Sequence, residues 1–197
     1  DNYVASQQLD YLGFTLEANI LDKVRVNFGY REEDNLQETS TFSVVNPGQV
    51  ETGLIDQTDY LPSAAATWWI SDAQQLRFGY SRTVSRPDFR ELSAAPYVDP
   101  ILDFTTFGNP DLVTAQIKNY DLRWEYYFSP TESVSIAAFR KEFTNPIEKQ
   151  LLPGSGSILL TLANAEAATN QGVEFDVYKQ LGFLDSWFDD SAWAQTL

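Results

Sequence analysis

The feature that most constrains this chain is a strict two-residue alternation of apolar and polar side chains in several segments. Between positions 75 and 82 the apolar residues are Leu76, Phe78 and Tyr80, with polar or small residues between them. Between positions 120 and 126 every second residue is aromatic or leucine, and Asp, Arg and Glu stand between. A period of two places successive side chains on opposite faces of a strand. Each segment is therefore predicted to be a strand with one apolar and one polar face, in a soluble sheet or in the wall of a membrane barrel.

The connections between the predicted strands alternate in length. Further strands are predicted at 12–18, 24–31, 60–70, 134–144 and 173–177, and residues 187–197 begin an eighth. Connections near 19–22, 71–74, 129–132 and 181–186 are short, and those at 32–57, 87–114 and 145–168 are long, the last with a small hairpin arm at 158–162. Outer-membrane barrels have short turns on one side and long loops on the other, whereas soluble sandwiches have turn signals at more regular spacing. The prediction is an all-β antiparallel meander that forms about eight strands of a larger transmembrane β-barrel.

Two details refine this prediction. Phe139 interrupts the alternation within 134–144, so a bulge or register change is expected there. Aromatic residues gather beside the short turns, where a membrane-interface belt would place them. These aromatic residues are Trp68, Trp69, Tyr126, Tyr127, Phe128, Trp187 and Phe188.

Composition excludes several classes of function. The 197 residues include no Cys, His or Met, which rules out a thiolate metal site and a histidine-dependent triad. A net charge of −15 disfavours nucleic acid as a partner. No apolar run reaches the length of a transmembrane helix, and we expect neither a cofactor nor a metal site. Because the first residues are not a signal peptide and no Met begins the chain, we expect an internal fragment of a longer protein.

Three motifs between residues 86 and 129 carry a resemblance to a known family. They are Arg86-Pro87-Asp88-Phe89 with Glu91-Leu92, Gly108-Asn109-Pro110-Asp111-Leu112, and Asn119-Tyr120-Asp121-Leu122 with Glu125-Tyr126-Tyr127-Phe128-Ser129. In order and spacing the chain resembles the barrel of TonB-dependent outer-membrane receptors. It departs at Val113-Thr114-Ala115-Gln116, where that family often has a Lys-Pro-Glu run. The resemblance covers most of residues 1–197.

The resemblance implies a fold, a location and partners. The fold would be a barrel of about 22 strands around an N-terminal plug, with 1–197 a partial barrel domain and the plug outside it. The location would be the bacterial outer membrane. The partners would be the TonB complex through the plug, the receptor's own plug domain, outer-membrane lipid and a small-molecule ligand such as a ferric siderophore, a carbohydrate or a cobalamin-like molecule. No bond would be made or broken by this chain.

A soluble all-β module that binds carbohydrate is the alternative, and an enzyme is the third class. In the soluble module, Leu76, Leu122 and Phe175 would meet in one dry core. In the barrel, the apolar residues would point away from the concave side, and an open arc alone would associate through its unpaired edges. The apolar residues expected to point outward are Leu76, Phe78, Tyr80, Leu122, Trp124, Val173, Phe175 and Val177.

Two groups of polar residues are candidates for function. Those expected to face the lumen are Arg77, Arg82, Asp121, Arg123, Glu125, Glu174 and Asp176. They would contact the plug and a passing solute, or pair with one another to serve only the fold. The ligand candidates in the outer loops are Arg86, Asp88, Arg90, Tyr97, Phe104 and Phe107. An enzyme would need a catalytic pair among the loop carboxylates Asp88, Glu91, Asp99 and Asp103. Acidic loops are usually only solvated, so this is the weakest of the three classes.

Overall fold

The computed structural model describes residues 3–43, 48–98, 105–152 and 159–184, and these form an almost entirely β structure. The long strands are β1 (Tyr3–Ile20), β2 (Val24–Phe42), β3 (Val50–Ser71), β4 (Gln74–Ser85), β7 (Ala115–Ser129), β8 (Glu132–Thr144) and β11 (Ala167–Tyr178). The short elements are α1 (Phe89–Leu92), β5 (Pro96–Val98), β6 (Thr105–Phe107), β9 (Ile147–Leu152), β10 (Leu159–Asn164) and the 3-10 helix η1 (Leu181–Leu184). Within the described residues, no helix has the length and apolar character needed to span a membrane.

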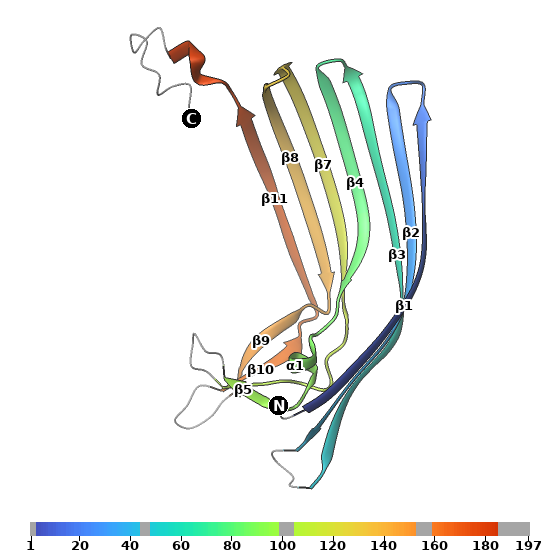
Figure 1. Cartoon of the computed structure of the whole chain (residues 1–197). Helices are drawn as coiled ribbons and strands as arrows, with labels where there is room; N and C mark the ends of the chain where they lie inside the picture. The colour runs from blue at the N-terminus through green and yellow to red at the C-terminus, as the bar shows by residue number, and fades with distance from the viewer. Residues whose placement is uncertain (1–2, 44–47, 99–104, 153–158, 185–197) are drawn as a thin grey trace.

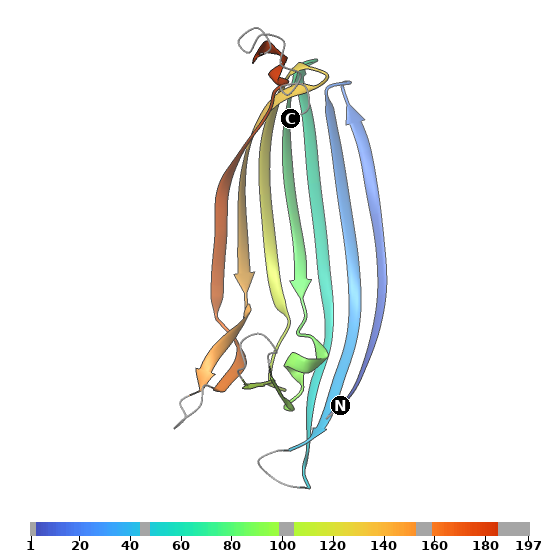
Figure 2. The ribbon, with the colours of Figure 1, turned by 60° about the vertical axis from the view of Figure 1, so that its left-hand side comes forward.

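The long strands make one open antiparallel sheet (Figures 1 and 2). Its seven strands lie in the order β1-β2-β3-β4-β7-β8-β11, and every neighbouring pair is antiparallel. The predicted meander is confirmed for these strands, and the predicted strand at 187–197 lies outside the described residues. β1 and β11 form the two edges of the described sheet. The short turns lie at one end of the sheet and the long connections at the other, as Figure 1 shows.

The predicted long connection at 32–57 is wrong. β2 and β3 stay paired without a break from Val24 opposite Trp68 to Phe42 opposite Val50. The apolar alternation fades after Tyr30 because polar side chains occupy both faces, yet the backbone ladder needs no apolar face to continue. What remains of this connection is the stretch 43–49.

The outward face carries unbroken apolar rows across the sheet. Residues directly opposite one another in a ladder project to the same side, so a row can be followed from strand to strand. One row consists of Ala18, Val26, Ala66, Phe78, Leu122, Ala138 and Val173. The next consists of Ile20, Val24, Trp68, Leu76, Trp124, Ile136 and Phe175. Every member of both rows is apolar, although several of the larger side chains are exposed, with Leu122 at 47% and Phe175 at 64%.

The bulge expected at Phe139 is absent. Phe139 keeps its register between Asp121 on β7 and Gly172 on β11. Its ring lies over Gly172, where an added Cβ would come within 2.8 Å of the ring. The missing side chain makes room for the aromatic ring on the polar face, so the strand does not need to bulge. The two register shifts of the sheet lie beside the short turns, between Trp69 and Ser71 and between Tyr127 and Ser129.

The long connections fold over the opposite, inner face of the sheet. β5, β6, β10 and β9 form a second, four-stranded sheet that joins the 87–114 connection to the 145–168 connection through parallel pairing of β6 with β10. The hairpin arm expected at 158–162 is present as β9 and β10. We call α1 and these four short strands together the loop platform. A small core of Ile55, Leu92, Leu112 and Leu162 fixes the loop platform to β3. Leu76, Leu122 and Phe175 share no dry core, since they lie on the outward face, which no described element covers.

Candidate functional site

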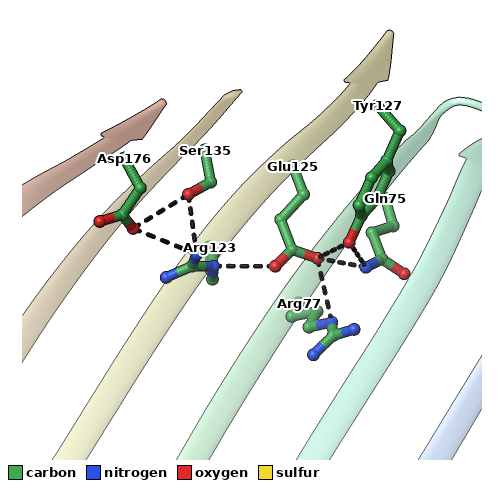
Figure 3. Close-up of polar contacts among 7 residues, drawn as sticks. All are labelled: Gln75, Arg77, Arg123, Glu125, Tyr127, Ser135 and Asp176. Atoms are coloured by element: carbon green, nitrogen blue, oxygen red, sulfur yellow. Dashed lines mark hydrogen bonds and ion pairs between the residues drawn. The ribbon is translucent and has the colours of Figure 1, made fainter. Parts of the chain in front are cut away.

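A connected polar network lies on the inner face near the short turns, centred on Glu125 of β7 (Figure 3). Glu125 Oε1 accepts from Arg123 Nε at 2.9 Å, and Glu125 Oε2 is 3.4 Å from Arg77 Nε. Gln75 and Tyr127 also donate to Glu125, and Gln75 Nε2 is 3.0 Å from the Tyr127 hydroxyl. The ladder between β4 and β7 brings these groups together, because Gln75 lies opposite Glu125 and Arg77 lies opposite Arg123.

Arg123 extends the network across β8 to β11. Arg123 Nη2 donates to Ser135 Oγ at 2.8 Å and lies 3.2 Å from Asp176 Oδ2, and Ser135 in turn donates to Asp176. The two arginines balance the two carboxylates, so the network is neutral. Glu125 is buried, whereas Arg77 and Asp176 keep about half of their side chains exposed. Hydrogen bonds from this many donors compensate the burial of the Glu125 carboxylate, and the exposed groups at the margins of the network are accessible from the inner face.

The remaining lumen candidates divide between the two faces. Asp121 and Glu174 lie on the inner face with Arg123, because they are separated from Arg123 and Asp176 by even steps in unshifted ladders. Arg82 does not. It follows Leu76, Phe78 and Tyr80 at even steps in a ladder without a bulge, so it projects outward and not into the lumen.

Arg86 fastens the loop platform to the inner face. Its guanidinium lies 2.8 Å from Glu33 Oε2 on β2 and 2.5 Å from Asp59 Oδ2 on β3. The side chains of Asp59 and Glu33 are only 1% and 9% exposed. Arg31 Nε adds a second ion pair to Glu33 at 2.6 Å. Arg86 was predicted as a ligand candidate, but its charge is already neutralised by two buried carboxylates.

The residues after Arg86 form a capped helical turn, and Gly108 packs closely against it. Asp88 is the N-cap of α1 and makes a reciprocal capping box with Glu91, so these carboxylates are engaged by backbone N–H groups. Leu92 is fully buried, and its carbonyl accepts from Thr39 on β2. Gly108 packs under this turn so closely that an added Cβ would lie 1.9 Å from the Ser93 carbonyl oxygen. The second family motif therefore begins with a residue that must lack a side chain.

Two asparagines join the platform's long connections. Asn109 Nδ2 donates to the Leu162 carbonyl at 2.9 Å. Asn164 accepts from the Val113 N–H and donates to the Val113 and Asn145 carbonyls at 2.9 and 2.7 Å. These bonds add to the β6–β10 ladder, so the two connections form one folded unit.

The other loop candidates are more exposed. Arg90 lies over the Tyr97 ring at 5.3 Å from its centroid, in the arrangement of a cation–π pair. Burial and the nearby carboxylates of Glu91 and Asp88 raise the pKa of Tyr97. Phe107 is half-buried in β6 opposite Pro96. Phe104, Asp99 and Asp103 lie outside the described residues.

Sequence reasoning missed a buried polar stripe on the inner face of β2. Glu33, Asn35, Gln37 and Thr39 are each at most 7% exposed, because the segment after Arg86 covers them. Gln37 donates to the Pro87 carbonyl at 2.8 Å. The signal that could have found the stripe is the run of hydrogen-bonding side chains at every second position from 33 to 41.

Comparison with known proteins agrees with this architecture. A family model described as TonB dependent receptor-like, beta-barrel, matches residues 1–196. A search of curated proteins found no match.

Several solved structures share the fold at low sequence identity. A double mutant of the Serratia marcescens hemophore receptor HasR, in complex with its hemophore HasA and heme, is 13% identical with a TM-score of 0.70 over 87% of this chain and 31% of that chain. The siderophore receptor PirA from Pseudomonas aeruginosa is 15% identical with a TM-score of 0.52 over 88% of this chain and 40% of that one. The ferric enterobactin receptor PfeA in complex with BCV-L6 is 14% identical with a TM-score of 0.51 over 88% and 33%. The chain thus spans between about a third and two fifths of these receptors.

Because this family model matches residues 1–196, the chain belongs to the TonB-dependent receptor β-barrel family.

Proposed function

We propose that this chain is part of the wall of an outer-membrane receptor that takes up a solute with energy from TonB. The observation that carries the proposal is the pair of apolar rows that run unbroken across seven strands on an exposed face. In water such a contiguous surface would drive association, whereas in a bilayer it matches the lipid-facing band of a barrel. The charged network and the loop platform lie on the other face, where a lumen would be.

The domain organisation follows from the two open edges. β1 and β11 each have one unpaired side in the described sheet. Unpaired backbone groups in lipid cost several kcal/mol each, so we propose that further strands pair with both edges. The chain would then be a partial barrel domain, with a plug domain filling the lumen and contacting the exposed margins of the Glu125 network.

Ligand capture is assigned to the loop platform at the outer end. Arg90, which is exposed, and Tyr97, the half-buried ring beneath it, are the predicted ligand candidates to which we assign this role. Arg86 is excluded from this role by its buried ion pairs, and Asp88 by its cap. The same cap argues against catalysis by Asp88 and Glu91, so the proposal remains transport without covalent chemistry. Identities of 13–15% to haem and siderophore receptors support the fold and do not select a solute.

Surface labelling in cells tests the placement. The sequence has no Cys, so Gln49→Cys in the β2–β3 connection and Asp72→Cys in a short turn each introduce a single thiol into it. In the complete receptor, a membrane-impermeant maleimide should label Gln49→Cys on intact cells and Asp72→Cys only after the outer membrane is permeabilised. Equal labelling of both thiols on intact cells would contradict the proposed orientation.

Uptake measurements test the transport step. Cells that carry the complete receptor would be offered ferric siderophores, haem and oligosaccharides, with and without functional TonB. We expect one ligand class to accumulate only when both the receptor and TonB are present. Uptake that persists without TonB would contradict the energy coupling.

A further inference from the structure

Three basic side chains lie together on the outward face, on the loop side of the apolar rows. Arg82 on β4 is directly opposite Lys118 on β7, and Lys118 is directly opposite Glu142 on β8. Arg140, two residues before Glu142, projects to the same face. Glu142 is the one acidic residue of this basic cluster, so the cluster carries a net positive charge.

Two of these charges have no counter-ion within the described residues. Arg140 pairs with Glu142 at 2.9 Å and donates to Gln171 Oε1 at 3.1 Å. Among the residues that the structure describes, neither the Arg82 nor the Lys118 side chain has a hydrogen bond or ion pair, and Arg82 Nε is enclosed without a partner. Like charges directly opposite one another destabilise a sheet. An anion from outside the chain would remove this repulsion.

The cluster lies where a membrane interface is expected. The rings of Tyr80 and Tyr120, one outward step nearer the apolar rows, are 5.3 Å apart. Tyrosines favour the headgroup level of a bilayer because they have an apolar ring and a polar tip. Arg82 and Lys118 come next along their strands, so they reach the layer of phosphates.

Acidic side chains project from the same outward face at the other edge of the sheet, on β1 and β2. Glu32 is as far along β2 from its short turn as Arg82 is along β4, and it also projects outward. Asp34 follows at the next outward position, directly opposite Asp10 on β1. An anionic headgroup would therefore be repelled by β1 and β2 and attracted by β4, β7 and β8.

We propose that Arg82, Lys118 and Arg140 bind the phosphate groups of an anionic lipid in the outer leaflet. A guanidinium offers a planar fork of N–H donors that matches phosphate oxygens, and a lysine ammonium adds a compact positive charge. The long stems of both side chains let the charges reach the phosphates while methylene groups lie along apolar surface. The inference rests on the proposed membrane placement.

Lipid titration of the complete receptor in neutral detergent tests the site. The probes are diphosphorylated lipid A, zwitterionic phosphatidylcholine and inorganic phosphate. Lipid A should bind the wild-type receptor tightly, and phosphatidylcholine and inorganic phosphate should bind far more weakly. At roughly fivefold per charge, Arg82→Gln combined with Lys118→Gln should weaken lipid A binding about 25-fold.

Two controls separate the site from general charge and from misfolding. Lys141→Gln removes a lysine between Arg140 and Glu142 on β8, but Lys141 projects to the inner face opposite Asn119, so lipid A affinity should not change. Glu142→Gln removes the cluster's acidic residue and should tighten lipid A binding about fivefold. A gain of affinity cannot arise from loss of folding.

Unchanged lipid A affinity in the double variant would overturn the inference, and so would inorganic phosphate binding as tightly as lipid A. A second measurement separates failure of this inference from failure of the proposed function. It is the quenching of Trp124, kept as the only tryptophan, by brominated lipid in nanodiscs. Quenching together with unchanged lipid A affinity would refute this inference and leave the proposed function standing. Absence of quenching would refute the proposed function as well.

Discussion

Replacing Arg86 with methionine should release the loop platform from the barrel wall. The substitution keeps an unbranched stem and removes the guanidinium, and with it the positive charge, between Glu33 and Asp59. Glu33 retains Arg31, but Asp59, which is 1% exposed at its side chain, loses its cationic partner. Breaking a buried ion pair by removing one partner costs about 3–5 kcal/mol. Asp59 regains water if the segment after Arg86 lifts away, so we expect local opening and not unfolding of the sheet.

Hydrogen exchange followed by mass spectrometry in nanodiscs measures this opening. An opening free energy lower by about 3 kcal/mol raises exchange in residues 87–95 roughly 100-fold or more. Arg90→Met is the matched control, because Arg90 is in the same segment and its guanidinium lies over the Tyr97 ring. An exposed cation–π pair contributes about 0.5–1 kcal/mol, so exchange should rise no more than about fivefold. Arg86→Met combined with Asp59→Asn should recover part of the protection. Wild-type exchange in Arg86→Met would refute the role of the buried ion pair.

Other substitutions probe the sheet and the platform. Leu122→Arg places a charge on the outward face and should lower folding stability in lipid vesicles by about 2–4 kcal/mol, whereas Glu125→Gln on the inner face should affect insertion much less; equal losses in denaturant titrations would contradict the facing. Gly108→Ala should disrupt the platform, since its Cβ would meet the Ser93 carbonyl, whereas Gly79→Ala should be tolerated because its nearest neighbour lies 3.6 Å away. Proteolysis of the platform at the same rate in both variants would refute the close packing of Gly108 against the α1 turn. Asn164→Ala should raise exchange in both long connections together, because its amide bonds to Val113 and Asn145; an effect confined to one connection would show that they are not coupled.

The strands of the apolar band could be predicted from sequence because their signal is local. Leu76, Phe78 and Tyr80 alternate with polar residues, and a period of two leaves few choices of fold. The charge of Arg82 predicts that it lies on the polar face, and this prediction is wrong. Arg82 projects outward, because it follows Phe78 at an even step in an unbroken strand and position in the alternation decides the face.

The loop platform could not be predicted because its contacts join residues far apart in the chain. Arg86 reaches Asp59 and Glu33, and Asn164 reaches Val113. No periodicity marks such pairs, and the strand extension through Gln37 is hidden because its inner face is polar and covered. Two of the three family motifs contain residues that cap α1 or pack and bridge the platform, whereas the third lies along β7 and supplies Glu125 and Tyr127 to the polar network.

The most direct test of the account compares two adjacent tryptophans. Trp68 projects outward beside Leu76 and is 48% exposed, whereas Trp69 projects inward, with Arg25 5.4 Å from its ring. In complete receptors that retain one or the other as the only tryptophan, lipid brominated at shallow acyl positions should quench Trp68 strongly and leave Trp69 nearly unchanged. Equal quenching of the two, or stronger quenching of Trp69, would contradict the assignment of the apolar face to lipid and the charged face to the lumen.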